Sequence, residues 1–343
     1  MSFIEKYSHQ DQDIGGPGQA LLIVDQLTKY FPIKGSLLSS KKEYVHAVNG
    51  VSFQVRKGET LGIVGESGCG KSTLAKLLSN LISPNEGSMI FDGQGINEQR
   101  GISLKNLRKN LQMVFQDSYS SLNPRLNILS SIAYGPIVHG MPKEEANQFA
   151  AYLMNRVGLE HTQFGARYPH ELSGGQRQRA NIARALSFSP RLLILDEAVA
   201  ALDKSVQAQV LNLLSELKEE EKLTYLFISH NLNVVNYMSD RVLVMYLGKI
   251  VEIGAVDRIF HQTAHPYTKA LLSAQPSVNP MKRQVNAPIT GDPPSPINLP
   301  IGCSFKTRCP FANGQCEEEP ELKMIDHASD HWVSCHHYLK ANK

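Results

Sequence analysis

The sequence has 343 residues, enough for one large domain and a smaller one, and its 42% hydrophobic and 20% charged residues are typical of globular proteins. No apolar run reaches the length of a membrane span, and residues 1–20 lack the apolar core of a signal peptide. We therefore expect a cytosolic protein that meets a membrane only through partners. The formal net charge of +3 is too weak to indicate nucleic-acid binding.

Predicted strands and helices alternate along most of the chain, after a lead-in at 1–19 that we expect to be flexible. Apolar or alternating runs predict strands at 21–24, 51–55, 61–64, 88–91, 111–116, 191–197 and 224–229, and a hairpin around Gly248 at 241–253. Helical periodicity covers 73–81, most of 123–174 and 204–222. This alternation indicates an α/β fold on a mainly parallel sheet, with a helical insert at about 117–175.

The strand at 61–64 leads into the pattern Gly-x-x-x-x-Gly-Lys-Ser, which begins at Gly65 and ends at Ser72. Its glycines allow successive N–H groups to point at a phosphate, and the following helix adds the positive end of its dipole. Lys71 can reach the β- and γ-phosphates of a nucleotide, and the Ser72 hydroxyl can bind Mg²⁺. Because a strand precedes this loop and a helix follows it, a nucleotide site is favoured over an ordinary glycine-rich turn.

Two carboxylates, Asp196 and Glu197, follow four apolar residues of a later strand. This places them at the carboxyl end of a central strand, where open α/β sheets bind ligands. We expect Asp196 to hold Mg²⁺, directly or through water, and Glu197 to polarise the attacking water. Alone, such a pair could simply cap the next helix, but together with a phosphate loop it indicates nucleotide hydrolysis.

A second anion-binding device is predicted where Ser173, Gly174 and Gly175 lead into a helix at 176–186. A hydroxyl and free N–H groups then stand at a helix N-terminus, which attracts anions. One chain would thus carry one phosphate loop but two phosphate-binding devices. A dimer resolves this, because each chain can complete the site of its partner.

Gln116 and His230 also end apolar strands, although a lone residue of this kind is a weak signal. With the other motifs beside them, the chain resembles the ATP-binding cassette (ABC) ATPases, the motor subunits of membrane transporters. The stretches that carry the resemblance occur in the family order: 65–73, Gln116, 172–176, 192–197, 201–203 and His230.

The resemblance implies a P-loop fold with a RecA-like core, an antiparallel β subdomain and the helical insert, together spanning 20–260. It assigns ATP binding to Gly65, Glu66, Ser67, Gly68, Cys69, Gly70, Lys71, Ser72 and Thr73. Phe31 would stack on the adenine, with Tyr30 as the alternative.

By the same resemblance, Mg²⁺ would be held by Ser72, Gln116 and Asp196, and catalysis would rest on Glu197, His230 and Gln116. The signature residues Ser173, Gly174, Gly175 and Gln176 would contact the ATP bound to the partner subunit. Ala200 and Asn231 depart from the Ser and Asp that are usual in the family.

Four other stretches, 121–125, 265–272, 291–296 and 303–310, resemble the dipeptide/oligopeptide permease branch of the family. This resemblance covers roughly 20–340, and the lead-in is similar to that of the second of the two ATPase subunits. It implies import of di- or oligopeptides, although relatives in the branch handle other substrates. The implied partners are a related ATPase in a heterodimer, two transmembrane permease subunits and, indirectly, an extracytoplasmic binding protein, which places the chain on the cytoplasmic face of the inner membrane.

Four cysteines, Cys303, Cys309, Cys316 and Cys335, fall in a predicted C-terminal extension at 261–343. In a reducing compartment, such a cluster favours metal over disulfides. Four thiolates can hold a [4Fe–4S] cluster or Zn²⁺, and the importer resemblance favours the cluster; unmetallated thiols are the third alternative. Because five prolines between 288 and 300 predict a semi-rigid connector, we expect loss of the metal to spare the ATP site.

The competing function is a soluble ABC ATPase that acts on nucleic acid or ribosomes. Such proteins typically carry long coiled coils or two cassettes in one chain. This sequence contains neither and has no basic patch, so no nucleic-acid partner is expected.

Overall fold

The computed structural model describes residues 13–16, 18–33, 43–96, 98–99, 101–274, 291–327 and 330–338. The chain forms two compact units. The helical unit comprises Met1–Ile23, Gln54–Thr60 and Ile90–Ser229, and the phosphate-loop unit comprises Val24–Phe53, Leu61–Met89 and His230–Lys343. Residues 1–12 of the predicted lead-in and 288–290 of the predicted connector lie outside the described residues.

The helical unit contains three parallel strands, β6 (Leu111–Val114), β7 (Leu192–Asp196) and β8 (Thr224–Ile228), in the order β8-β7-β6. Every residue of β7 and β8 is buried. Their nearly unbroken apolar runs follow from this burial, because a parallel strand covered on both faces has no solvent side for alternating polar residues. The register places Asp196 opposite Ile228, at the carboxyl ends of both strands.

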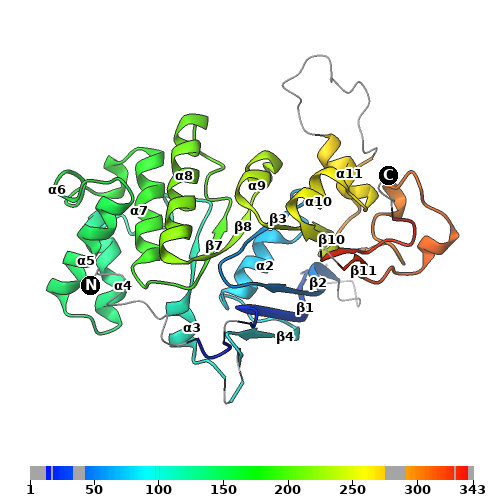
Figure 1. The fold of residues 1–343 in the computed structure, drawn as a ribbon, viewed down its shortest axis with the longest axis horizontal. Coiled ribbons are helices and arrows are strands. Elements are labelled where there is room, and N and C mark those ends of the chain that lie inside the picture. The colour runs from blue at the N-terminus through cyan, green and yellow to red at the C-terminus, as the bar shows by residue number, and fades with distance from the viewer. Residues whose placement is uncertain are drawn as a thin grey trace. The chain divides into compact units, whose positions relative to one another are not determined.

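Helices form much of this unit, and α4, α5 and α7 pack against one another (Figure 1). The apolar periodicity that predicts these helices corresponds to a buried face. In α5 the buried residues recur at helical spacing, namely Ala146, Phe149, Ala150, Leu153 and Met154. The elements are α3 (Leu104–Asn110), α4 (Ile128–Val138), α5 (Lys143–Arg156), α6 (His161–Phe164), the 3-10 turn η2 (Pro169–Glu171), α7 (Gly174–Leu186) and α8 (Lys204–Glu221).

One sheet of the phosphate-loop unit has the order β11-β12-β10-β9-β3. Its strands are β3 (Thr60–Val64), β9 (Arg241–Tyr246), β10 (Lys249–Ala255), β11 (Lys323–Asp326) and β12 (His331–Val333). β9 lies parallel to β3 and turns into antiparallel β10 through Leu247 and Gly248, whose φ angles of 45° and 78° suit a two-residue hairpin. The predicted hairpin is thus confirmed, and β12 continues the sheet by pairing with β10.

The same unit holds most of a second sheet. Its strands are neighbours in the order β2 (Tyr44–Val55), β1 (Leu22–Pro32) and β4 (Glu86–Phe91). The end of β4 pairs with β5 (Gln94–Gly95), which belongs to the helical unit. The helices of the phosphate-loop unit are α2 (Lys71–Leu78), α9 (Leu232–Met238), α10 (Val256–His261) and α11 (Pro266–Ser273), with the 3-10 turns η4 (Lys306–Arg308) and η5 (Gly314–Glu317). Among the described residues, no helix has the length and apolar character that a membrane span requires.

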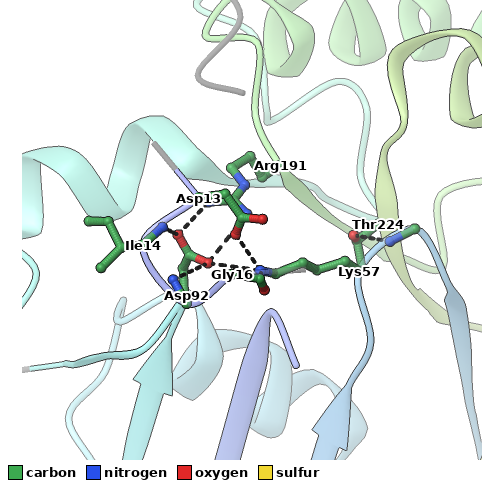
Figure 2. Close-up of polar contacts among 9 residues, drawn as sticks. Asp13, Ile14, Gly16, Lys57, Asp92, Arg191 and Thr224 are labelled. Carbon is green, nitrogen blue, oxygen red and sulfur yellow. Dashed lines mark hydrogen bonds and ion pairs between the residues drawn. The ribbon is translucent and has the colours of Figure 1, made fainter. Parts of the chain in front are cut away.

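An ion network around the buried Asp92 of the helical unit ties down part of the predicted lead-in (Figure 2). Arg191 binds Asp92 at 2.5 Å and Asp13 at 3.1 Å, and Lys57 binds the same two carboxylates. The N–H of Ile14 donates to Asp92 at 3.0 Å. Burial raises the pKa of Asp92, but the hydrogen bond and charge of Arg191 outweigh it and lower that pKa to about 2. Residues 13–16 are therefore anchored by charge.

Candidate functional site

The phosphate loop links β3 to α2 and depends on glycines at both ends. Gly65 and Gly70 have φ angles of 153° and 109°, which side chains disfavour. A Cβ atom would also lie 2.3 Å from the Met245 carbonyl at Gly65 and 2.1 Å from the Ala47 carbonyl at Gly70. Within the described residues, no side chain caps the N-terminus of α2, which leaves this helix end suited to a phosphate.

Lys71 lies folded across this loop. Its Nζ atom donates to the carbonyl oxygens of Gly65 at 2.8 Å and Glu66 at 3.0 Å, and only 6% of the residue is exposed. Burial raises the pKa of the neighbouring Cys69 thiol despite the charge of Lys71, which keeps that thiol neutral at physiological pH. The ammonium group is thus the positive charge that the loop offers to a phosphate.

Gln116 and Glu197 meet in the helical unit. The Gln116 Nε2 atom donates to Glu197 Oε2 at 2.6 Å. Glu197 follows the last residue of β7 with a φ of 49°, a left-handed conformation that is uncommon for glutamate and is often found at functional sites. Its own N–H donates to the Ile228 carbonyl at 2.9 Å, which helps to hold this conformation. Asp196, beside it, is buried.

The signature stretch starts α7 with a capping box. Ser173 Oγ accepts from the Gln176 N–H at 3.3 Å, and Gln176 Oε1 accepts from the Ser173 N–H at 3.0 Å. A Cβ at Gly175 would lie 2.4 Å from Val206 Cγ1, whereas a Cβ at Gly174 would meet only Leu202 Cδ2 at 3.9 Å. Gly175 therefore has no room for a side chain, whereas a methyl group at Gly174 would make only an ordinary van der Waals contact with Leu202.

His230 and the predicted adenine residue belong to the phosphate-loop unit. Asn231, next to His230, caps α9 by accepting from the N–H groups of residues 233 and 234, a role in which Asn equals Asp. Tyr30 packs edge-on against Tyr44 with 5.1 Å between ring centroids, while Phe31 is 39% exposed. Phe31 is thus the more exposed of the two residues, although the Lys29 Nζ atom lies 5.4 Å from the centroid of its ring.

The four terminal cysteines converge on one small cavity, which His265, Phe305 and other side chains also line. All four thiols are free. Burial raises the pKa of Cys303, Cys309 and Cys335, the last to about 11, and the neighbouring cysteines add to this effect. Four sulfur donors around one cavity suit a metal, yet in the described part of the chain no three His, Cys, Asp or Glu residues are arranged to hold one.

The predicted site residues are divided between the two units. The loop at 65–73, Phe31, His230 and the cysteines belong to the phosphate-loop unit, whereas Gln116, Asp196, Glu197 and 173–176 belong to the helical unit. Sequence reasoning missed Tyr267 and Arg308, which both contact Glu66 of the phosphate loop. Both lie in stretches that resemble the peptide-importer branch, 265–272 and 303–310, and this resemblance could have drawn attention to them.

Comparison with known proteins identifies two family models in the chain. Residues 48–200 match the ABC transporter family, and 251–316 match the C-terminal region of oligopeptide/dipeptide transporters. The oligopeptide transport ATP-binding protein AppF of Bacillus subtilis is 50% identical over 326 residues, covering 93% of this chain and 98% of the relative. The dipeptide transport ATP-binding protein DppF of Escherichia coli is 45% identical over 307 residues, covering 89% and 91%.

Two solved structures share the fold. CbiO1 of Clostridium perfringens, part of the ABC transporter complex CbiONQ, matches with a TM-score of 0.60 and 28% identity, over 70% of this chain and 90% of its own. A post-hydrolysis dimer of the ATP-binding cassette MJ0796, bound to ADP and phosphate, matches with a TM-score of 0.59 and 27% identity, over 68% and 98%. The predicted ABC fold is confirmed, and the chain belongs to the ATP-binding proteins of ABC transporters, in the group with the oligopeptide/dipeptide transporter C-terminal region.

Proposed function

We propose that this ABC ATPase powers the import of di- or oligopeptides. The observation that carries the proposal is the similarity to peptide-transport ATP-binding proteins, which spans about nine-tenths of the chain and includes the C-terminal region at 251–316. A protein that acts on nucleic acid or ribosomes finds no support in these comparisons.

The chemistry would be hydrolysis of ATP held by Gly65–Thr73, with Phe31 against the adenine. Lys71 would neutralise the β- and γ-phosphates, and oxygen donors from Ser72, Gln116 and Asp196 suit Mg²⁺. Glu197 would orient and polarise the attacking water, and His230 would contact the γ-phosphate. The 2.6 Å hydrogen bond from Gln116 to Glu197 supports this assignment, because it fixes the direction of the carboxylate.

The working form would be a heterodimer with a related ATPase. Ser173, Gly174, Gly175 and Gln176 would receive the γ-phosphate of ATP bound to that partner. The lack of a side chain at Gly174 supports the idea, since even an added Cβ atom would come no closer than 3.9 Å to its nearest neighbour, Leu202 Cδ2. ATP would clamp the two subunits together, and hydrolysis would release them.

The remaining partners would be two transmembrane permease subunits and, indirectly, an extracytoplasmic peptide-binding protein. Closure and release of the ATPase pair would drive alternating access in the permeases. In this arrangement the chain is a peripheral subunit on the cytoplasmic face of the membrane.

The four terminal cysteines would hold a [4Fe–4S] cluster, with Zn²⁺ as the alternative. Their convergence on one cavity supports a metal, which would crosslink three short segments of the extension. Protein purified without oxygen should contain about four irons per chain. Stoichiometric zinc would overturn the cluster, and metal-free protein would overturn the metal. Cys303→Ser should lose the metal, whereas Cys69→Ser, which removes the fifth cysteine, should retain it.

The transport proposal is tested by reconstituting the chain with its permeases and the second ATPase in lipid vesicles. ATP hydrolysis should rise when peptide and binding protein are added, and labelled peptide should accumulate only with ATP. The same assembly carrying Glu197→Gln is the control. Stimulation by RNA or ribosomes with no response to peptide would contradict the proposal.

A further inference from the structure

Arg308 of the C-terminal extension reaches the phosphate loop, 242 positions away in sequence. Its Nη1 and Nη2 atoms donate to the two carboxylate oxygens of Glu66 at 2.9 and 3.2 Å, a bidentate ion pair. The Arg308 side chain is only 7% exposed and that of Glu66 23%, so solvent screens the pair weakly. Nη1 also donates to the Tyr246 hydroxyl at 3.4 Å, which anchors the guanidinium to the end of β9.

A second contact fixes the backbone of the same loop residue. The Glu66 N–H donates to the Tyr267 hydroxyl at 2.9 Å, across 201 sequence positions. Tyr267 is fully buried in an aromatic cluster with Tyr246 and Phe305, at centroid distances of 4.6 and 5.4 Å. Phe305 belongs to the cysteine-bearing segment, and Tyr267 itself lies within the extension at 261–343, so the extension supplies both Tyr267 and Arg308.

These contacts matter because the loop has little rigidity of its own. Gly65, Gly68 and Gly70 all have positive φ and lose much conformational entropy when the loop is ordered. Glu66 also places a negative charge beside a site that must receive polyanionic ATP. Arg308 therefore acts in two ways: it holds the loop in shape, and it neutralises a carboxylate that would repel the ligand.

We propose that Arg308 and Tyr267 are positioning residues for the phosphate loop, so that the C-terminal extension sets the affinity of the site for ATP. The proposal rests on the assignment of 65–73 as the ATP-binding loop. It revises the expectation that the extension can be disturbed without effect on the ATP site. The proline-rich connector separates the two in sequence, but within the phosphate-loop unit they are in direct contact.

The test is Mg·ATP affinity, measured with a fluorescent ATP analogue, for Arg308→Met and for Lys306→Met as its matched control. Lys306 lies two residues away and pairs with Glu317 inside the extension, so its loss removes the same charge without touching the loop. Arg308→Met should bind ATP about tenfold more weakly, as expected for loss of a charge-assisted bidentate pair. Lys306→Met should bind like wild type.

A double-mutant cycle separates charge from shape. In the Arg308→Met background, Glu66→Gln removes the unpaired negative charge and should restore part of the affinity, while the loss of shape remains. Arg308→Lys keeps the charge but not the fork and should fall between wild type and Arg308→Met. Tyr267→Phe keeps the ring packing and should weaken ATP binding by a few-fold through loss of one acceptor.

Two readouts distinguish positioning from a general loss of structure. In the assembled transporter, Arg308→Met should raise the KM for ATP and leave kcat at saturating ATP nearly unchanged, with a nucleotide-free melting temperature close to that of wild type. Equal affinities for Arg308→Met and Lys306→Met, or an affinity loss that follows a fall in melting temperature, would overturn the proposal. If Lys71→Ala binds ATP normally, the assignment of the loop itself is wrong.

Discussion

The N-termini of α2 and α7 are both suited to phosphate, and they are built in opposite ways. The end of α7 is self-sufficient, because Ser173 and Gln176 cap each other within four residues. The end of α2 has no such cap among the described residues, and its loop is held by Tyr267 and Arg308 from the far end of the chain. One end is complete by itself, and the other depends on tertiary structure.

The difference fits the roles proposed for the two ends. A helix end that must meet a ligand carried by another subunit gains from being pre-formed and from presenting no side chain, as at Gly174. A loop that must wrap around its own ligand needs glycine freedom, and that freedom has to be restrained from outside. Flexible phosphate sites should therefore be more sensitive to distant mutations than capped ones.

The largest expected effect is the loss of ATP turnover in Glu197→Gln, a substitution that leaves the N-termini of α2 and α7 intact. Glu197→Gln keeps an acceptor for Gln116 but removes the charge that polarises water, so turnover should fall by about 10²- to 10⁴-fold. ATP binding should stay close to wild type. Steady-state hydrolysis and nucleotide affinity are measured in the assembled transporter, with Glu219→Gln on the exposed surface of α8 as control. Wild-type turnover in Glu197→Gln would refute its role.

Lys71→Ala should break the α2 end directly. The ammonium that now binds the loop carbonyls is the charge available to the phosphates, so ATP affinity should fall by about 100-fold. Lys76→Ala, in the last turn of the same helix and exposed, should have no comparable effect. Titration of a fluorescent nucleotide compares the two variants, and equal affinities would exclude Lys71 from the site.

Gly174→Asp should disable the α7 end for the partner alone. The added carboxylate would repel the incoming γ-phosphate, and hydrolysis at the partner's site should fall by about tenfold or more. ATP binding to this chain's own loop should stay normal, because Gly174 belongs to the helical unit and the loop belongs to the phosphate-loop unit. Mixing the variant with wild-type partner measures both. Loss of this chain's own binding with an unaffected partner would refute the two-subunit site.

Alanine substitutions at Gly174 and Gly175 compare the space that the fold leaves at these two positions. Gly174→Ala should leave stability unchanged, whereas Gly175→Ala places a methyl group against Val206 and should cost about 1–3 kcal/mol of unfolding free energy. Chemical denaturation of the two variants gives the comparison. Equal stabilities would mean that Val206 moves aside freely.

The last prediction concerns pH and spares both helix ends. The folded-state pKa of Asp92, about 2, lies below its ordinary value of 3.8. Its ionised form therefore contributes ~2 kcal/mol above about pH 4, and this is lost as pH falls toward 2. Asp92→Asn should flatten the acid limb of the stability curve. An unchanged pH dependence would show that the network stabilises little.

Sequence reasoning succeeded where structure depends on near neighbours. The strand, loop and helix around residues 61–78, the existence of a helix after Ser173 and the apolar runs of β7 and β8 are all encoded within a few residues, whereas the capping box of α7 was not predicted. It failed where two distant segments meet, as Arg308 and Glu66 do across 242 positions. The left-handed backbone of Glu197 was equally hidden, because it depends on the strand beside it. Proximity in sequence is a poor guide to what holds a glycine-rich loop.

The ion network around Asp92 has a practical consequence for expressing this chain. Asp13 and the N–H groups of residues 14 and 15 are integral to the fold of the helical unit. Shortening the protein past Gly16 would remove the Asp13 carboxylate from Lys57 and Arg191, whereas an affinity tag placed before residue 1 leaves Asp13 in place. Trimming what looks like a dispensable tail would thus loosen a domain.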